Sequence, residues 1–127
     1  GEPTLRFSAL KEIASWVKLQ GGKVRVDTNG LLFTFMSKDS LKQLKGLVDV
    51  WSVSLNAPDK ETYNKVCKPV QPDAFEMVKE FIKEAKSLGF EVIATAVDVP
   101  GVDMKKTEEL AKSLGAKWRA RVYESVG

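Results

Sequence analysis

Short apolar segments of strand type alternate along the chain with segments whose apolar residues recur at helical spacing. The strand-type segments begin near residues 23, 48, 90 and 117, so the intervals between them are long enough for a helix that returns across a sheet. Parallel strands need such crossovers, whereas antiparallel strands can be joined by a two-residue turn. The alternation therefore predicts an α/β fold of parallel βα repeats with right-handed crossovers.

The expected elements follow from periodicity and from stop signals. Glycine after a helical pattern, or a Pro-Gly pair after a strand, marks each boundary. Helices are expected over residues 8–20, 38–45, 73–88 and 104–114, strands over residues 23–28, 48–55, 90–99 and 117–123, and an irregular stretch between residues 58 and 72. Such repeats fit an open sheet or consecutive units of a barrel. Because the chain opens on a loop sequence instead of a strand, we expect a segment upstream of it.

One cysteine and the absence of histidine limit the chemistry of the chain. Cys67 alone cannot form an internal disulfide, and by itself it cannot supply a zinc site or a four-thiolate iron–sulfur site. Without histidine, no imidazole is available for acid–base or triad chemistry. We expect Cys67 to be a buried small residue and not an activated nucleophile.

The charged residues do not indicate a macromolecular partner. The 20 basic and 17 acidic residues give a net charge of +3 and are interspersed, which is typical of a solvated surface. No basic stretch is interleaved with aromatic residues, which argues against nucleic-acid binding. No segment approaches the roughly 18 apolar residues of a membrane span, and the N-terminus lacks a signal-peptide pattern. We expect one cytoplasmic domain over residues 1–127 without nucleic-acid or membrane partners.

Polar residues gather where the expected strands end. In parallel α/β folds, ligands bind at the carboxyl ends of the strands. The residues at these positions are Gly1, Glu2, Pro3, Thr4, Thr28, Asn29, Gly30, Ser52, Ser54, Asn56, Asp98, Pro100, Arg119, Arg121 and Glu124. Ser54 and Asn56 flank Leu55, so strand alternation predicts that both point to the same side.

Each of these patterns has a purely structural alternative. Asn29-Gly30 is a preferred hairpin turn, so an antiparallel hairpin competes with the βα connection there. Against the hairpin, residues 31–35 do not alternate as the partner of residues 24–28 should. Ser54 and Asn56 could cap the exit loop of their strand, and a strand arginine could pair with a structural acid.

Three of these segments, in this order, resemble the radical S-adenosylmethionine (radical SAM) superfamily. The sequence GEPT at residues 1–4 resembles the GGEPT motif that follows the family's second strand. VRVDTNG at residues 24–30 resembles the end of its third strand, and VDVWSVSLNA at residues 48–57 resembles its fourth. Residues 92–100 and 118–121 are similar to its fifth and sixth strands. The resemblance covers nearly the whole chain and is greatest to the radical SAM proteins associated with TatD-family nucleases.

The resemblance implies a fold and a cofactor. The fold is part of a partial TIM-type (βα)6 barrel, about strands two to six of the radical SAM core. The family's GEP residues hold the amino group of S-adenosylmethionine, its fourth-strand polar residues contact the carboxylate or ribose, and the segment after the fifth strand passes near the adenine. The residues implied in cofactor binding are Gly1, Glu2, Pro3, Thr28, Asn29, Ser54, Asn56, Val97, Pro100 and Arg119.

The chain departs from the family in one respect. Family members hold a [4Fe-4S] cluster on a CxxxCxxC loop, which this sequence lacks. The resemblance implies a parent protein that cleaves S-adenosylmethionine reductively to a deoxyadenosyl radical. We expect the chain alone to be an inactive fragment that retains neither cofactor and self-associates through free strand edges. The alternatives are a stand-alone α/β binding module without redox activity and a cluster-free barrel enzyme acting on a phosphate or sugar. The sequence does not indicate the substrate.

Overall fold

A computed structural model describes residues 1–122 of the chain. Its α-helices are α1 (Phe7–Leu19), α2 (Lys60–Cys67), α3 (Ala74–Ser87) and α4 (Met104–Ser113), its 3-10 helices are η1 (Pro3–Arg6), η2 (Leu32–Thr34) and η3 (Lys38–Leu44), and its strands are β1 (Arg25–Thr28), β2 (Val50–Ser54), β3 (Glu91–Asp98) and β4 (Lys117–Val122). Two sequence expectations, the end of the last strand at Tyr123 and the candidate Glu124, lie outside the described residues. None of the helices in residues 1–122 has the length and apolar character that a membrane crossing requires.

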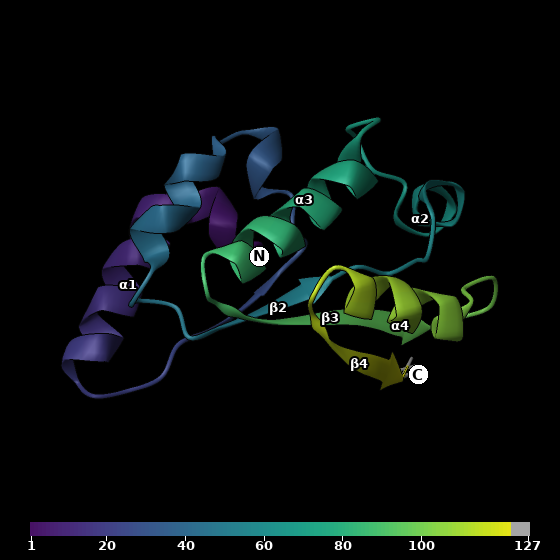
Figure 1. The fold of residues 1–127 in the computed structure, drawn as a ribbon. Helices are drawn as coiled ribbons and strands as arrows, with labels where there is room; N and C mark the ends of the chain where they lie inside the picture. Colours follow the sequence, from purple (N-terminus) through teal and green to yellow (C-terminus); the bar gives the residue numbers. More distant parts are fainter. Residues whose placement is uncertain (123–127) are drawn as a thin grey trace, which may run out of the picture.

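The four strands form one parallel sheet in the order β1-β2-β3-β4 (Figure 1). This confirms the predicted α/β fold and excludes the hairpin across Asn29-Gly30, because β1 pairs in parallel with β2. The reason lies in the residues after the turn. Leu32 is fully buried in the core on η2, a position that a solvent-facing hairpin strand would not give it.

Helices α3 and α4 cover one face of the sheet (Figure 1). The apolar residues of α3 recur every three or four positions, so Val78 and Phe81 both point into the core. Trp51 of β2 is fully buried and meets the ring of Phe81 edge to face, with 5.1 Å between the centroids. Side chains at alternate positions of the same strands point to the opposite face, where the polar residues gather.

One segment differs from its predicted structure, and a second is helical as predicted but is a 3-10 helix. Residues 60–67, expected to be irregular, form α2, which begins because the Asp59 carboxylate accepts a hydrogen bond from the backbone N–H of Thr62 at 2.8 Å. Residues 38–44, which lie within the short helix expected over residues 38–45, form the 3-10 helix η3. Its buried residues Leu41 and Leu44 are three positions apart, which suits three residues per turn.

We expect acid to weaken an ion pair that joins α1 to the sheet. The Asp49 carboxylate lies 2.6 Å from the Lys18 ammonium and also accepts the backbone N–H of Val24 at 2.7 Å. The hydrogen bond from Lys18 has the larger effect and the one from Val24 the smaller, and both hold the pKa of Asp49 below its ordinary value of 3.8. The pair therefore stabilises the fold above pH 3.8, and this contribution is lost as the pH falls through the lower folded-state pKa.

Denaturant unfolding at a series of pH values checks this expectation. Asp49→Asn should be less stable than wild type at neutral pH and should lose part of the acid-dependent fall in the free energy of unfolding. Asp39→Asn, which removes an exposed aspartate, should follow the wild-type curve. Parallel curves for wild type and Asp49→Asn would contradict the role given to Asp49.

Candidate functional site

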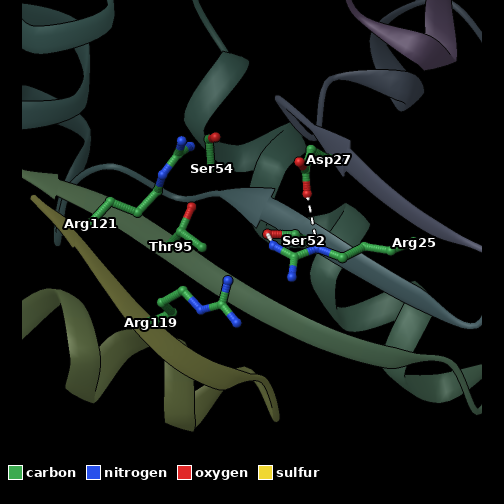
Figure 2. Close-up of a pocket in the computed structure, with 7 residues that line it drawn as sticks. All are labelled: Arg25, Asp27, Ser52, Ser54, Thr95, Arg119 and Arg121. Carbon is green, nitrogen blue, oxygen red and sulfur yellow. Dashed lines mark hydrogen bonds and ion pairs between the residues drawn. The ribbon is translucent and has the colours of Figure 1, made fainter.

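A polar cavity of about 110 Å³ opens on the sheet face opposite to Trp51 and Val53. Strand alternation brings one or two polar side chains to it from each strand. The residues that line it are Arg25, Asp27, Ser52, Ser54, Thr95, Arg119 and Arg121 (Figure 2). Three guanidinium groups, three hydroxyl groups and one carboxylate therefore face a common space.

The strand register sets the order of these groups across the sheet. Ser54 pairs with Thr95, and Thr95 pairs with Arg119, so one row carries two hydroxyls and a guanidinium. On β1, Arg25 Nε lies 3.2 Å from the Asp27 carboxylate, and the same guanidinium donates to Ser52 Oγ at 3.4 Å. Figure 2 shows Arg25 reaching over Ser52 while Arg119 approaches from the other edge of the sheet.

A second polar cluster joins Glu2 to the carboxyl end of β1. Its Oε2 atom accepts the backbone N–H and the hydroxyl of Thr4, at 3.0 and 2.6 Å, and the hydroxyl of Thr28 at 2.8 Å. Its Oε1 atom accepts the backbone N–H of Asn29 at 2.7 Å. The structure thus brings the GEPT segment and the TNG turn together, as the sequence analysis expects of Glu2, Thr28 and Asn29.

This cluster fits a cationic ligand group. Oε2 of Glu2 already accepts three hydrogen bonds, whereas the protein supplies one donor to Oε1. A carboxylate oxygen accepts about two hydrogen bonds, so Oε1 retains capacity for one more donor. An ammonium group is a suitable donor, because a charge-assisted hydrogen bond is about twice as strong as a neutral one.

Asn56 and Ser54 contact different parts of the protein. Strand β2 ends at Ser54, and Asn56 has a left-handed backbone with φ of 69°, so alternation does not extend to it. Its Nδ2 donates to Cys67 Sγ at 3.4 Å, whereas Ser54 lines the cavity. The strand alternation on which the shared direction of both side chains was expected therefore does not reach Asn56, and a binding role of Asn56 stays a prediction.

Cys67 lies at the end of α2 and is partly buried. Burial raises the pKa of its thiol, against the smaller opposite effect of the hydrogen bond from Asn56. The thiol is therefore protonated at neutral pH, which agrees with the expectation that Cys67 is not an activated nucleophile.

The other residues implied in cofactor binding lie near the same edge of the sheet. Val97 of β3 pairs with Arg121 and shares a face with Thr95, so it lies beside the cavity. Pro100 is exposed in the turn after β3. Gly1 and Pro3 flank Glu2, and Pro3 begins η1. A role for each of these residues in binding stays a prediction.

Strand alternation could have identified the residues that the sequence analysis did not assign to the site. Arg25 and Asp27 lie in the strand expected over residues 23–28, and Thr95 lies in the one expected over residues 90–99. In β1 the polar residues are two positions apart, as are Arg119 and Arg121 in β4. Placing these pairs on one face of a parallel sheet gives the cavity.

The donors of the described residues do not fit an iron–sulfur cluster. Residues 1–122 contain no group of three cysteine, histidine, aspartate or glutamate side chains placed to hold a metal ion. The whole chain has one cysteine, whereas such clusters are held by several thiolates. No residue of this chain is therefore assigned to cluster binding.

We expect alanine at Gly30 to be more harmful than at a glycine of the same backbone conformation. Gly30 in the TNG turn has φ of +77°, and an added Cβ would lie 2.9 Å from a methyl group of Val53 and 3.1 Å from one of Val78. Gly46 has φ of +79° but no atom within 4 Å of such a Cβ. Gly46→Ala should cost about 1 kcal/mol through backbone strain, and Gly30→Ala about 1–3 kcal/mol more through overpacking.

Equilibrium unfolding in urea of both variants and wild type measures this difference directly. Equal losses of stability in the two variants would contradict the close packing of the TNG turn against β2 and α3.

Comparison with known proteins places these features in a family context. The family described as Radical SAM superfamily matches residues 1–114. The S-adenosyl-L-methionine-dependent tRNA 4-demethylwyosine synthase of Pyrococcus horikoshii is 29% identical over 112 residues, which make up 88% of this chain and 32% of that protein. An uncharacterized protein of Methanocaldococcus jannaschii is 30% identical over 115 residues, 90% of this chain and 38% of that protein. The chain thus spans about a third of the length of these relatives.

A solved structure shares the fold. The crystal structure of a domain of pyruvate-formate lyase-activating enzyme from Bacteroides vulgatus has a TM-score of 0.65 to this chain and covers 94% of both chains. The sequence identity is 14%, so this likeness concerns the arrangement of strands and helices alone. It agrees with a parallel βα sheet that forms part of a TIM-type barrel.

Proposed function

This chain belongs to the radical SAM superfamily, and we propose that it forms the S-adenosylmethionine-binding part of an enzyme that cleaves this cofactor reductively. The observation that carries the proposal is the family match over residues 1–114. The matched segment contains Glu2, whose carboxylate accepts hydrogen bonds from Thr28 and Asn29. The substrate and the product are not part of this proposal.

The polar groups at the carboxyl ends of the strands suit the functional groups of the cofactor. The free capacity of Glu2 Oε1 suits the ammonium of the methionine moiety. The hydroxyl of Ser54, at the end of β2, suits its carboxylate or the ribose. Thr28 and Asn29 line the same region through their contacts with Glu2. The bound cofactor would supply a cleavable sulfonium group, and the chain's own residues would orient it and shield it from water.

We infer that cysteines outside these 127 residues hold the [4Fe-4S] cluster. The relatives are about three times as long as this chain, and its single cysteine cannot hold such a cluster. A CxxxCxxC sequence in the same gene product, encoded upstream of Gly1, is the expected source.

The β1 side of the sheet offers a surface for another βα unit of the same barrel. β1 is an edge strand, and an apolar cleft of about 350 Å³ runs between it and α1. Ile13, which lines this cleft, and Trp16 on the same helix are each 63% exposed. A parallel strand added to β1 would pair its free backbone groups and its helix would cover these side chains.

Calorimetric titration with S-adenosylmethionine tests the proposal on the full-length product of the gene that encodes this chain. We expect saturable binding that Ser54→Ala weakens about tenfold, whereas Ser113→Ala, at the exposed last residue of α4, leaves it unchanged. A full-length product without three suitably spaced cysteines, or one that does not bind S-adenosylmethionine, would overturn the proposal. The first result would favour the stand-alone binding module.

A further inference from the structure

Arginine is concentrated on one face of this chain. Only four arginines occur in the sequence, and three of them, Arg25, Arg119 and Arg121, line the cavity of the open sheet face. We propose that this cavity binds a phosphate group of the enzyme's substrate. The inference rests on the proposed function, because it places the substrate in the barrel interior beside the cofactor.

The charges around the cavity leave an excess of positive charge. Arg25 pairs with Asp27, whose side chain is 77% exposed, and no other acid in the part of the chain that the structure describes lines the cavity. Arg119 and Arg121 form no ion pair with any acid among residues 1–122. Lys117 lies two residues before Arg119 on the same face of β4, and its charge is neutralised by an ion pair with Glu91. The cavity therefore carries two net positive charges, a value that matches the charge of about −1.5 to −2 on a phosphomonoester at pH 7.

The kinds of donor also favour phosphate. A guanidinium group offers a planar fork of N–H donors that matches phosphate oxygens in pairs, which the ammonium of lysine cannot do. Ser52 adds a hydroxyl donor between the arginines, whereas the Thr95 hydroxyl already donates to the carbonyl oxygen of Val53 at 3.4 Å and Ser54 is proposed to contact the cofactor. A carboxylate has two oxygens and one charge, so it would leave part of this donor set without a partner.

The size of the cavity indicates that it takes one group and not a whole ligand. Its volume of about 110 Å³ is well below the roughly 300–1,000 Å³ of pockets that enclose complete small molecules. The rest of the substrate would therefore extend through the open side of the face. The charge and the number of free oxygens assign the phosphate to a phosphomonoester, because a phosphodiester of a nucleic-acid backbone carries one charge and two free oxygens.

Binding measurements on the full-length gene product, without cluster reconstitution, test the proposal. The probes are uridine 5′-monophosphate, hexauridylate without terminal phosphates, inorganic phosphate and methionine. The variants are Arg25→Ala, Arg121→Ala and Arg121→Lys, with Lys105→Gln as a control that removes an exposed charge from α4. Arg119 is not varied, because it is also implied in cofactor binding.

We expect inorganic phosphate to displace the uridine ligand and methionine not to displace it. Each arginine-to-alanine variant should weaken binding about 10- to 100-fold, Arg121→Lys should weaken it less, and Lys105→Gln should have no effect. The mononucleotide, a phosphomonoester, should bind more tightly than hexauridylate, and the reverse order would contradict the assignment to a phosphomonoester.

Three results would overturn the proposal: no binding of either uridine ligand, binding that does not depend on Arg25 and Arg121, or displacement by methionine as strong as by phosphate. Titration of the same wild-type protein with S-adenosylmethionine separates this failure from failure of the proposed function. A protein that binds the cofactor but not phosphate would refute the phosphate site alone.

Discussion

Glu2→Ala is expected to weaken S-adenosylmethionine binding by about 10- to 100-fold and to destabilise the protein by about 1–3 kcal/mol. The loss of affinity has two causes. The carboxylate is the proposed partner of the ligand ammonium, and it also accepts hydrogen bonds from Thr4, Thr28 and Asn29. Without it, the GEPT segment and the TNG turn lose their direct connection. Calorimetric titration gives the affinity, and urea unfolding gives the stability.

Two further variants separate these causes. Glu2→Gln keeps an oxygen that accepts hydrogen bonds but removes the charge, so we expect it to recover stability more than affinity. Glu12→Ala removes an exposed carboxylate from α1 and should change neither quantity. Wild-type affinity in Glu2→Ala would contradict the assignment of this carboxylate to the cofactor, even if the variant were less stable.

Phe81→Ala is expected to produce the largest loss of stability, about 3–5 kcal/mol. Phe81 of α3 is fully buried, and its ring contacts Trp51 of β2 and Phe33 of η2 at centroid distances of 5.1 and 5.7 Å. Its removal would leave a cavity between α3 and the sheet. Because natural domains are stable by only about 5–15 kcal/mol, a large part of the folding free energy would be lost.

Phe35→Ala is the matched control, because it removes the same side chain from a position that is 47% exposed. We expect it to cost less than about 1 kcal/mol. Guanidinium unfolding followed by tryptophan fluorescence measures both variants. Similar losses in the two variants would contradict the placement of Phe81 at the centre of the core.

The sequence predicted the order of the elements because long periodic segments carry a strong signal. The α3 segment repeats Phe75, Val78 and Ile82 at helical spacing, and the observed helix differs from the expected one by one residue at each end. The segment around η3 was less predictable, since a seven-residue pattern with Leu41 and Leu44 fits either helix type. Only packing selects the 3-10 form there.

Helix α2 was missed because its stabilising features are few. Tyr63 is its buried residue, and it packs against Phe75, which is distant in sequence, at 5.2 Å between ring centroids. The local signal was the cap formed by Asp59 with Thr62. A short helix of this kind depends on tertiary contacts that periodicity does not reveal.

The site was predictable to the extent that strand ends predict it. Glu2, Thr28 and Asn29 came together as expected because β1 ends beside the start of η1. The arginine cavity was not predicted, since Arg25 and Arg121 converge only through the register of four strands. The finer resemblance to TatD-associated proteins, the single domain over residues 1–127 and self-association through strand edges remain predictions.

Reductive cleavage of S-adenosylmethionine is the reaction whose assay decides the proposed function. The full-length gene product, reconstituted with iron and sulfide without oxygen and reduced with dithionite, would be supplied with S-adenosylmethionine, and the products would be separated by chromatography. We expect formation of 5′-deoxyadenosine and methionine, with neither formed when the reductant is omitted. A reduced protein that carries a four-iron cluster, binds S-adenosylmethionine and forms no 5′-deoxyadenosine would contradict the proposed function.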